Sequence, residues 1–286
     1  MVTELVRPES NYQSAFRALR TAKPTAAWVE LVRESAMDRF ESLGFPAVRD
    51  EEWKYTNLAQ LAKEEFRHSI VPSSLTGEDV AQFSFPETVN SNLVLINGVL
   101  RDDLSKVNAL EKIVATDLFT AISDARYNKI VRSYLARNAN YNDRGLTALN
   151  TAFLQSGVFV LIPKNVQLEA PLQITFVADS TVSTNVNFPR VLVVAEENSS
   201  AKLVESFVSV GEHSYFTNAV VEIVAKDGAR LEHCRLQEER LNAYHVATSS
   251  IELGRGSSYN STAINLGGKL ARHDISVVMN HEGAEC

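Results

Sequence analysis

The stretch from Pro189 to Cys286 repeats one pattern of apolar and polar positions. Each unit contains a short apolar run, a turn of small or polar residues, and a second short run. The turns are centred on Ser200, Gly228, Gly256 and Gly283, at intervals of 28, 28 and 27 residues. A fixed interval of this size is typical of a solenoid, in which each unit buries its apolar face only against its neighbours.

The runs between the turns have the composition of strands. They are rich in β-branched residues and are bounded by Gly, Ser, Asn and Asp, as at 191–194, 219–224 and 275–278. Alternate side chains of a strand point to the same face, so the positions five and seven residues before each turn lie on one face. Most of these positions are small or apolar: Ala195, Ile223, Ile251 and Val278, with Val193, Val221, Ser249 and Ser276. The pattern predicts a parallel β-helix or a closely related β-solenoid, with Ile223 directly above Ile251.

The earlier part of the chain carries helical periodicity instead. Residues 1 to about 70 are expected to be helical, with one helix between an N-cap at Thr25 and a stop at Gly44. A second helical piece is expected from Glu51 to about Phe66, followed by a loop over 69–88. The next expected element is a strand at 93–96 that ends in the hairpin signal Asn97-Gly98. Helices are expected at 117–122 and 129–137, and strands at 158–162 and 172–177. The segment 146–154 is ambiguous.

These patterns together predict an α+β protein with two domains. Residues 1–145 would form a mainly helical N-terminal domain with a short strand segment, and residues 146–286 would form the β-helix core.

Composition narrows the functional classes. A net charge of −7 argues against a nucleic-acid or anionic-membrane surface. No apolar run approaches the roughly 18 residues of a membrane span, and residues 1–7 lack the basic start and apolar core of a signal peptide. Cys234 and Cys286 are the two cysteines and make no disulfide framework. We therefore expect a cytoplasmic protein.

The candidate chemistry gives no convergent set of residues. Gly267-Gly268-Lys269 lacks the Ser or Thr and the first Gly of a phosphate loop. His245 and His273 lie 28 residues apart, so stacking would bring them to roughly 4.8 Å, the spacing of neighbouring strands. They could then share a metal ion, although a ladder of surface polar side chains is the favoured interpretation. Cys234 is expected to be a small inward side chain beside Leu236, with His233 pointing outward.

Carboxylates are the usual tools of β-helix enzymes that act on polysaccharides. Glu222, Glu252, Asp274 and Glu282 are available, but they do not recur at one position of the repeat. We therefore assign no catalytic, cofactor-binding or metal-ligating residue from the sequence.

Several stretches together resemble the SufD branch of the SufB/SufD family of iron–sulfur cluster assembly proteins. The resemblance runs along the whole chain, and the Glu-Glu-Trp-Lys-Tyr-Thr stretch favours SufD over its paralogue SufB. The stretches that carry it are Glu51-Glu52-Trp53-Lys54-Tyr55-Thr56, Leu149-Asn150-Thr151-Ala152-Phe153, Leu161-Ile162-Pro163-Lys164, and Gly267-Gly268 with Arg272 and Asp274-Ile275-Ser276-Val277.

The resemblance implies a helical N-terminal domain followed by a right-handed parallel β-helix. It also implies a non-catalytic scaffold role, with a SufB-like paralogue and a SufC-like ATPase as partners and an iron–sulfur cluster that is transient at the level of the complex. No cofactor is then expected on this chain itself. The alternatives are a β-helix polysaccharide lyase or hydrolase, and a metal-binding β-solenoid module.

The chain stops three residues after its fourth turn, in the middle of a unit. Cys286 there takes the repeat position of Leu203, Leu231 and Tyr259, whereas a terminal solenoid unit normally carries a polar cap. We expect a C-terminally truncated chain, in which Cys286 would be a core residue of the intact protein. We also expect an exposed strand edge at this end and self-association through it.

Overall fold

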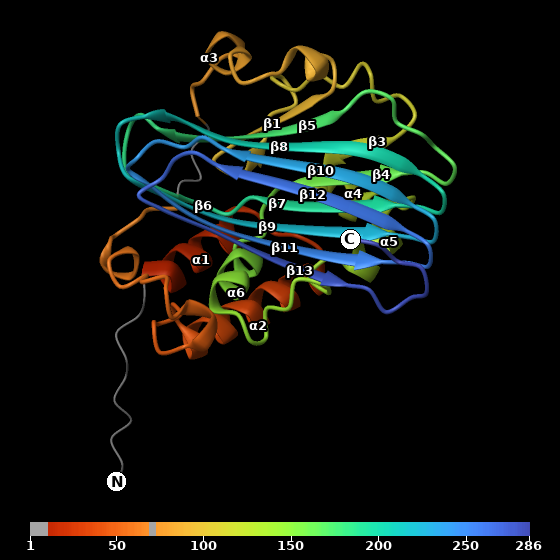
Figure 1. Ribbon diagram of the computed structural model, residues 1–286. Helices are drawn as coiled ribbons and strands as arrows, with labels where there is room; N and C mark the ends of the chain where they lie inside the picture. The colour runs from red at the N-terminus through yellow and green to blue at the C-terminus, as the bar shows by residue number, and fades with distance from the viewer. Residues whose placement is uncertain (1–10, 69–72) are drawn as a thin grey trace.

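The computed structural model describes residues 11–68 and 73–286 as two stacked β-sheets with helices on their outer faces (Figure 1). Expectations placed on residues 1–10 and 69–72, within the predicted helical region and the following loop, lie outside the described residues. The helices are α1 (Asn11–Ala22), α2 (Ala27–Leu43), α3 (Gly77–Ala81), α4 (Leu118–Ser123), α5 (Asn128–Tyr134) and α6 (Gly145–Ala152), with 3₁₀ turns η1 (Glu51–Trp53), η2 (Leu61–Lys63) and η3 (Pro86–Thr88). The strands are β1 (Asn92–Ile96), β2 (Val99–Leu100), β3 (Val114–Asp117), β4 (Val158–Ile162), β5 (Leu172–Ser180), β6 (Asn185–Asn187), β7 (Arg190–Ala195), β8 (Ser200–Gly211), β9 (Tyr215–Ala225), β10 (Arg230–Gln237), β11 (Ala243–Leu253), β12 (Ser258–Asn265) and β13 (Leu270–Val278).

The chain forms both sheets by winding alternately between them. Sheet A has the strand order β13-β11-β9-β7-β4-β3, with β6 beside β9, and sheet B has the order β12-β10-β8-β5-β1-β2. From β7 onward each strand of sheet A is followed by a strand of sheet B, and successive strands within a sheet pair in parallel. This arrangement is a parallel β-helix preceded by helices, which confirms the predicted fold class.

The register of the stacked strands agrees with the sequence prediction at its centre and departs from it at both ends. Ile223 pairs with Ile251, as the 28-residue interval requires. The interval is 30 residues between β7 and β9, where Val193 pairs with Ile223, and 26 residues between β11 and β13, where Ile251 pairs with Val277. The predicted ladder positions of Ser276 and Val278 are therefore wrong, because they place these residues on the opposite face of β13.

The corner that leads from sheet A to sheet B explains the 30-residue interval between β7 and β9. One residue in each unit has a left-handed backbone: Asn165 (φ 62°), Asn198 (57°), Gly228 (70°), Gly256 (59°) and Gly283 (72°). The N–H group of each of the first four donates to a carbonyl of the next unit, at 2.8–3.0 Å. Asparagine is the residue after glycine that best tolerates this conformation. The left-handed corner residue is thus Asn198 rather than Ser200, and an alignment on Ser200 is shifted by two residues.

Apolar side chains fill the half of the β-helix interior that lies next to this corner. The interior cluster includes Val193, Ile223, Leu231 and Ile251, each at most 2% exposed. Farther from the corner, the rings of Phe176 and Phe207 stack with centroids 4.3 Å apart. Parallel stacking of this kind buries each apolar side chain against equivalents above and below it, which holds successive turns in register.

Helices cover the outer face of sheet A (Figure 1). One buried cluster joins α1, α2 and α6 to aromatic side chains of β9 and β11, and a second joins α4 and α5 to β4 and β7. Phe153 lies at the centre of the first cluster and stacks on Phe188 at 4.5 Å. The helical part is therefore packed directly on the β-helix rather than tethered to it.

The helix predictions have mixed outcomes. Gly44 ends α2 as predicted, with φ 67° and its N–H donated to the carbonyl of Phe40. Thr25 is not the N-cap, because α2 begins after Ala26 and no side chain caps it. The helical piece predicted from Glu51 to Phe66 is wrong, since only the short turns η1 and η2 form there. The ambiguous segment 146–154 is largely helical, as α6.

Strands from the first part of the chain extend both sheets. Asn97-Gly98 forms the predicted hairpin between β1 and β2, and β1 pairs in parallel with β5. The antiparallel strand β3 pairs with β4. The domain division near residue 145 stays a prediction. Among the described residues, no helix combines the length and the apolar character needed to cross a membrane.

Candidate functional site

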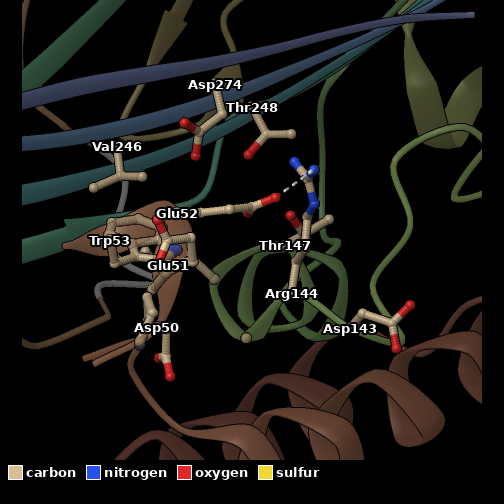
Figure 2. A pocket seen from close by; sticks show the side chains of 13 residues that line it. Asp50, Glu51, Glu52, Trp53, Asp143, Arg144, Thr147, Val246, Thr248 and Asp274 are labelled. Atoms are coloured by element: carbon tan, nitrogen blue, oxygen red, sulfur yellow. Dashed lines mark ion pairs between the residues drawn. The ribbon is translucent and has the colours of Figure 1, made fainter. Parts of the chain in front are cut away.

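Residues 50–53, at the start of the Glu51–Thr56 stretch, line a cleft between the helical part and the β-helix. The cleft has a volume of about 230 Å³ and is bounded by η1, the start of α6, and the outer face of β11 and β13. Figure 2 shows Trp53 beneath Val246, and the Arg144 guanidinium directed at the Glu52 carboxylate. Segments that lie far apart in the sequence thus form one concave surface.

The cleft is rich in carboxylates. Five acidic residues line it with a single basic residue, Arg144. The Arg144 guanidinium lies 3.9 Å from the Glu52 carboxylate, and both side chains are more than a third exposed. An exposed ion pair at this distance contributes little to stability, because solvent screens it. The acidic residues are Asp50, Glu51, Glu52, Asp143 and Asp274.

Trp53 and Thr56 bind a residue of the last strand. The Arg272 guanidinium carbon lies 3.9 Å from the centre of the Trp53 ring, and its Nη1 donates to Thr56 Oγ1 at 3.1 Å. Arg272 also pairs with Asp274 at 2.8 Å. This arrangement is a cation–π contact reinforced by hydrogen bonds. Arg272, in one of the stretches that carry the family resemblance, therefore contacts Trp53 and Thr56 in another.

A second contact between the helical part and the β-helix is buried beneath α6. Asn150 Oδ1 and Thr151 Oγ1 accept hydrogen bonds from Arg190 Nη1 at 3.0 and 3.2 Å. Arg190 in turn pairs with Glu222 at 2.5 Å, and both side chains are fully buried. The Glu222 carboxylate also accepts four backbone N–H groups, from residues 136–139, at 2.9–3.1 Å. Glu222, a candidate catalytic carboxylate in the sequence, thus fixes a loop to the sheet.

The far half of the β-helix interior is polar rather than apolar. Glu239, Arg235 and His245 are each at most 3% exposed and face one another between the sheets. His245 Nδ1 lies 2.5 Å from Glu239 Oε2, and Arg235 Nη2 donates to His245 Nε2. Because a guanidinium can only donate, His245 must carry its proton on Nδ1 and donate it to Glu239. Arg235 also lies over the Phe207 ring, at 4.6 Å.

Hydrogen bonds keep Glu239 ionised despite its burial. Burial alone would raise the pKa of Glu239, but His245 and hydrogen bonds from Gln237 and Thr217 outweigh it and lower that pKa. Thr217 Oγ1 donates at 3.0 Å and Gln237 Nε2 at 3.1 Å. A buried charge persists when it is both paired and hydrogen-bonded, and this carboxylate meets both conditions.

A second buried carboxylate lies one strand away. Glu205 Oε1 is 3.6 Å from His233 Nε2, and His233 Nδ1 is hydrogen-bonded to Tyr259 Oη at 2.7 Å. Burial opposes ionisation of Glu205, but His233 and Arg235 outweigh it and lower the pKa of Glu205. In this half of the interior, the buried carboxylates are therefore offset by basic side chains within the protein.

The structure corrects the histidine prediction. His245 pairs with Ala271, and His273 pairs with Ala247, so the two histidines are not neighbours on adjacent turns. His245 is also fully buried, so the surface-ladder interpretation is wrong for it as well. Burial, followed by the charge of Arg235, lowers the pKa of His273 to about 3, which keeps this ring neutral. In the part of the chain that the structure describes, no His, Cys, Asp and Glu side chains converge in threes to hold a metal ion.

The expected orientation of β10 is wrong. His233 and Arg235 point into the β-helix, whereas Cys234 lies on the outer face and is partly exposed. Cys234 pairs with Val204 and Thr262. The apolar residue Leu231 on the same strand indicates which alternate positions of β10 face inward. Cys286 is exposed in the structure.

The other candidate carboxylates do not converge. Glu252 pairs with Val224 and Val278 on the outer face of sheet A, and Asp274 lies in the cleft with Arg272. Glu282 is exposed at the corner, where its carbonyl accepts the Gly256 N–H. Sequence reasoning missed Glu205, Arg235 and Glu239, because charged residues on an inward face contradict the usual apolar pattern.

Comparison with known proteins agrees with the resemblance found in the sequence. Residues 176–286 match the family described as SUF system FeS cluster assembly, SufBD core domain, and residues 7–174 match the SufBD protein N-terminal region. The chain is 31% identical over 264 residues to the iron–sulfur cluster assembly SufBD family protein slr0076 of Synechocystis sp., covering 88% of this chain and 57% of the relative.

Two further relatives come from a plant and from another bacterium. Protein ABCI7, chloroplastic, of Arabidopsis thaliana is 24% identical over 271 residues, covering 90% of this chain and 54% of the relative. The iron–sulfur cluster assembly protein SufD of Bacillus subtilis is 29% identical over 210 residues, covering 71% of this chain and 47% of the relative. The chain spans about half the length of these curated relatives.

Proposed function

Because this chain belongs to the SufBD family of iron–sulfur cluster assembly proteins, we propose that it acts as a non-catalytic scaffold subunit. In this role it pairs with a SufB-like paralogue and a SufC-like ATPase in the cytoplasm. The observation that supports the proposal is the contact between the two parts of the chain that match the family. The N-terminal region and the β-helix core are both matched by the family, and they are held together by Trp53, Thr56 and Arg272.

A scaffold must hold its binding surfaces in a fixed relation. The cleft contact of Trp53 with Arg272 and the buried bonds of Arg190 with Asn150 and Glu222 join the same two layers at two places. Buried hydrogen-bonded networks of this kind restrict relative motion. They support a platform whose helical face and β-helix face move as one unit.

The ionisable groups of the chain also support a non-catalytic role. Glu222 is bound by four backbone N–H groups and a guanidinium, and Glu239 by a threonine, a glutamine and a histidine. A general acid or base needs a titratable position within reach of a substrate. Both carboxylates are instead buried and engaged within the protein. We propose that the cluster is cargo of the assembled complex, and that it is held transiently there.

The test is co-purification from cells that express the full-length protein with an affinity-tagged SufC-like ATPase and an untagged SufB-like paralogue. We expect all three chains to elute together in a constant ratio. The variant Arg272→Ala, which removes the Trp53 contact, should weaken retention, whereas Glu252→Gln on the outer face should not. A complex of the ATPase and paralogue that forms while this protein flows through would refute the proposal.

A further inference from the structure

A small cavity lies inside the β-helix, between the two sheets. Its volume is about 10 Å³, and the side chains of Phe176, Phe207, Asn187, Thr217 and Glu239 contribute to its walls. All five of these side chains are less than 5% exposed. A space of this volume is at the size of a single water molecule and is too small for any larger ligand.

Asn187 brings two unused polar atoms to this cavity. It lies on β6 directly opposite Thr217 of β9, so both side chains point into the interior. Asn187 is 2% exposed, and among the described residues neither its amide oxygen nor its amide nitrogen has a hydrogen-bond partner. A buried amide with no partner is rare in native proteins and usually marks the position of an ordered water.

The neighbouring groups can complete the coordination of a water. Thr217 donates its hydroxyl proton to Glu239 Oε1 at 3.0 Å, and its oxygen retains lone pairs that can accept a second hydrogen bond. A buried water typically makes two to four hydrogen bonds, and Asn187, Thr217 and Glu239 supply that number of partners. A metal cation fits poorly, because two phenylalanine rings form part of the wall and the cavity offers too few oxygens.

We propose that one structural water molecule occupies this cavity and bridges the Asn187 amide to Thr217 and Glu239. The water accepts a hydrogen bond from Asn187 Nδ2 and donates to the Thr217 hydroxyl oxygen or to the Glu239 carboxylate. It joins β6 to the polar ladder of the interior, in which Asn187, Thr217 and His245 occupy equivalent positions on successive strands. The site is independent of the proposed scaffold role.

The first test is a crystal structure of the protein at a resolution that shows ordered water. We expect an isolated density peak within about 3.2 Å of the Asn187 amide and of at least one oxygen of Thr217 or Glu239. An amide that is bonded to protein atoms beside a dry cavity would overturn the proposal. This measurement needs no variant, so it decides the question even if substitutions impair folding.

The second test counts long-lived internal waters by oxygen-17 magnetic relaxation dispersion. Asn187→Leu keeps the number of side-chain heavy atoms and the branch at Cγ but removes both polar atoms, so the count should fall by one relative to wild type. Asn108→Leu replaces an exposed asparagine and is the matched control, for which no change is expected. An unchanged count in folded Asn187→Leu would refute the assignment.

Discussion

The buried carboxylate of Glu222 offers the sharpest test of the structure, through the substitution Glu222→Gln. In the folded protein this side chain is fully buried, pairs with Arg190 and accepts the N–H groups of residues 136–139. Glutamine has the same shape but no charge. Its NH₂ group would face backbone N–H donors, and the Arg190 charge would lose its partner.

The expected loss of stability is large. Removing one member of a buried ion pair costs about 3–5 kcal/mol, because the remaining charge stays buried without compensation. A backbone N–H left without an acceptor adds about 1–3 kcal/mol. We therefore expect the free energy of unfolding to fall by at least about 4 kcal/mol, out of the 5–15 kcal/mol typical of native proteins.

Chemical denaturation followed by far-ultraviolet circular dichroism measures this loss. Glu252→Gln is the matched control, because Glu252 lies on the outer face of sheet A, where its neighbours on the adjacent strands are Val224 and Val278. Its free energy of unfolding should stay within about 0.5 kcal/mol of wild type. If Glu222→Gln unfolds within about 1 kcal/mol of wild type, the carboxylate is not structural, and the argument against a catalytic role for it fails.

Three further predictions concern other parts of the fold. Arg272→Ala should change the fluorescence of Trp53 and lower stability by about 0.5–1 kcal/mol; an unchanged emission spectrum would show that the cleft contact does not form in solution. Gly228→Ala should cost more than 1 kcal/mol in a thermal melt, because φ is 70° and the new Cβ would lie 2.4 Å from the Asn198 side chain, whereas Gly77→Ala, with open space around it, should be nearly neutral. Burial, with Lys23 and Arg33, lowers the pKa of His68 to about 4, so the unfolded chain binds its proton below about pH 6.5 while the folded protein does not. Stability should therefore be complete above pH 6.5 and fall as the pH drops toward 4, and His68→Gln should flatten this dependence; equal slopes for wild type and variant in melts at pH 7 and pH 5 would contradict it.

The β-helix was predictable from the sequence because its physics is local and repetitive. A strand that stacks on its own predecessor needs similar side chains at similar intervals, and Ile223 and Ile251 meet that requirement. Between β7 and β9 the register failed because a corner uses Asn198 in place of glycine, and asparagine has many other roles and does not mark a turn by itself.

The candidate site was less predictable, because it depends on contacts between distant segments. Nothing local to Glu51–Thr56 shows that Trp53 will rest on Arg272, and this docking replaces the expected helix with a 3₁₀ turn. The inward charges of β10 were missed for a related reason. Arg235 is tolerated inside the protein only because Glu205, Glu239 and His245 come from other strands to meet it.

The spacing of the left-handed corner residues shows that the number of residues per turn of the β-helix decreases along the chain. Successive corners, from Asn165 through Asn198, Gly228 and Gly256 to Gly283, are separated by 33, 30, 28 and 27 residues, so the circumference shrinks along the axis. Backbone hydrogen bonds between turns hold the corner edge of the stack, so the difference in length falls in the remainder of each turn. The units are consequently not interchangeable. Duplicating or transplanting a whole turn would therefore misfit its neighbours.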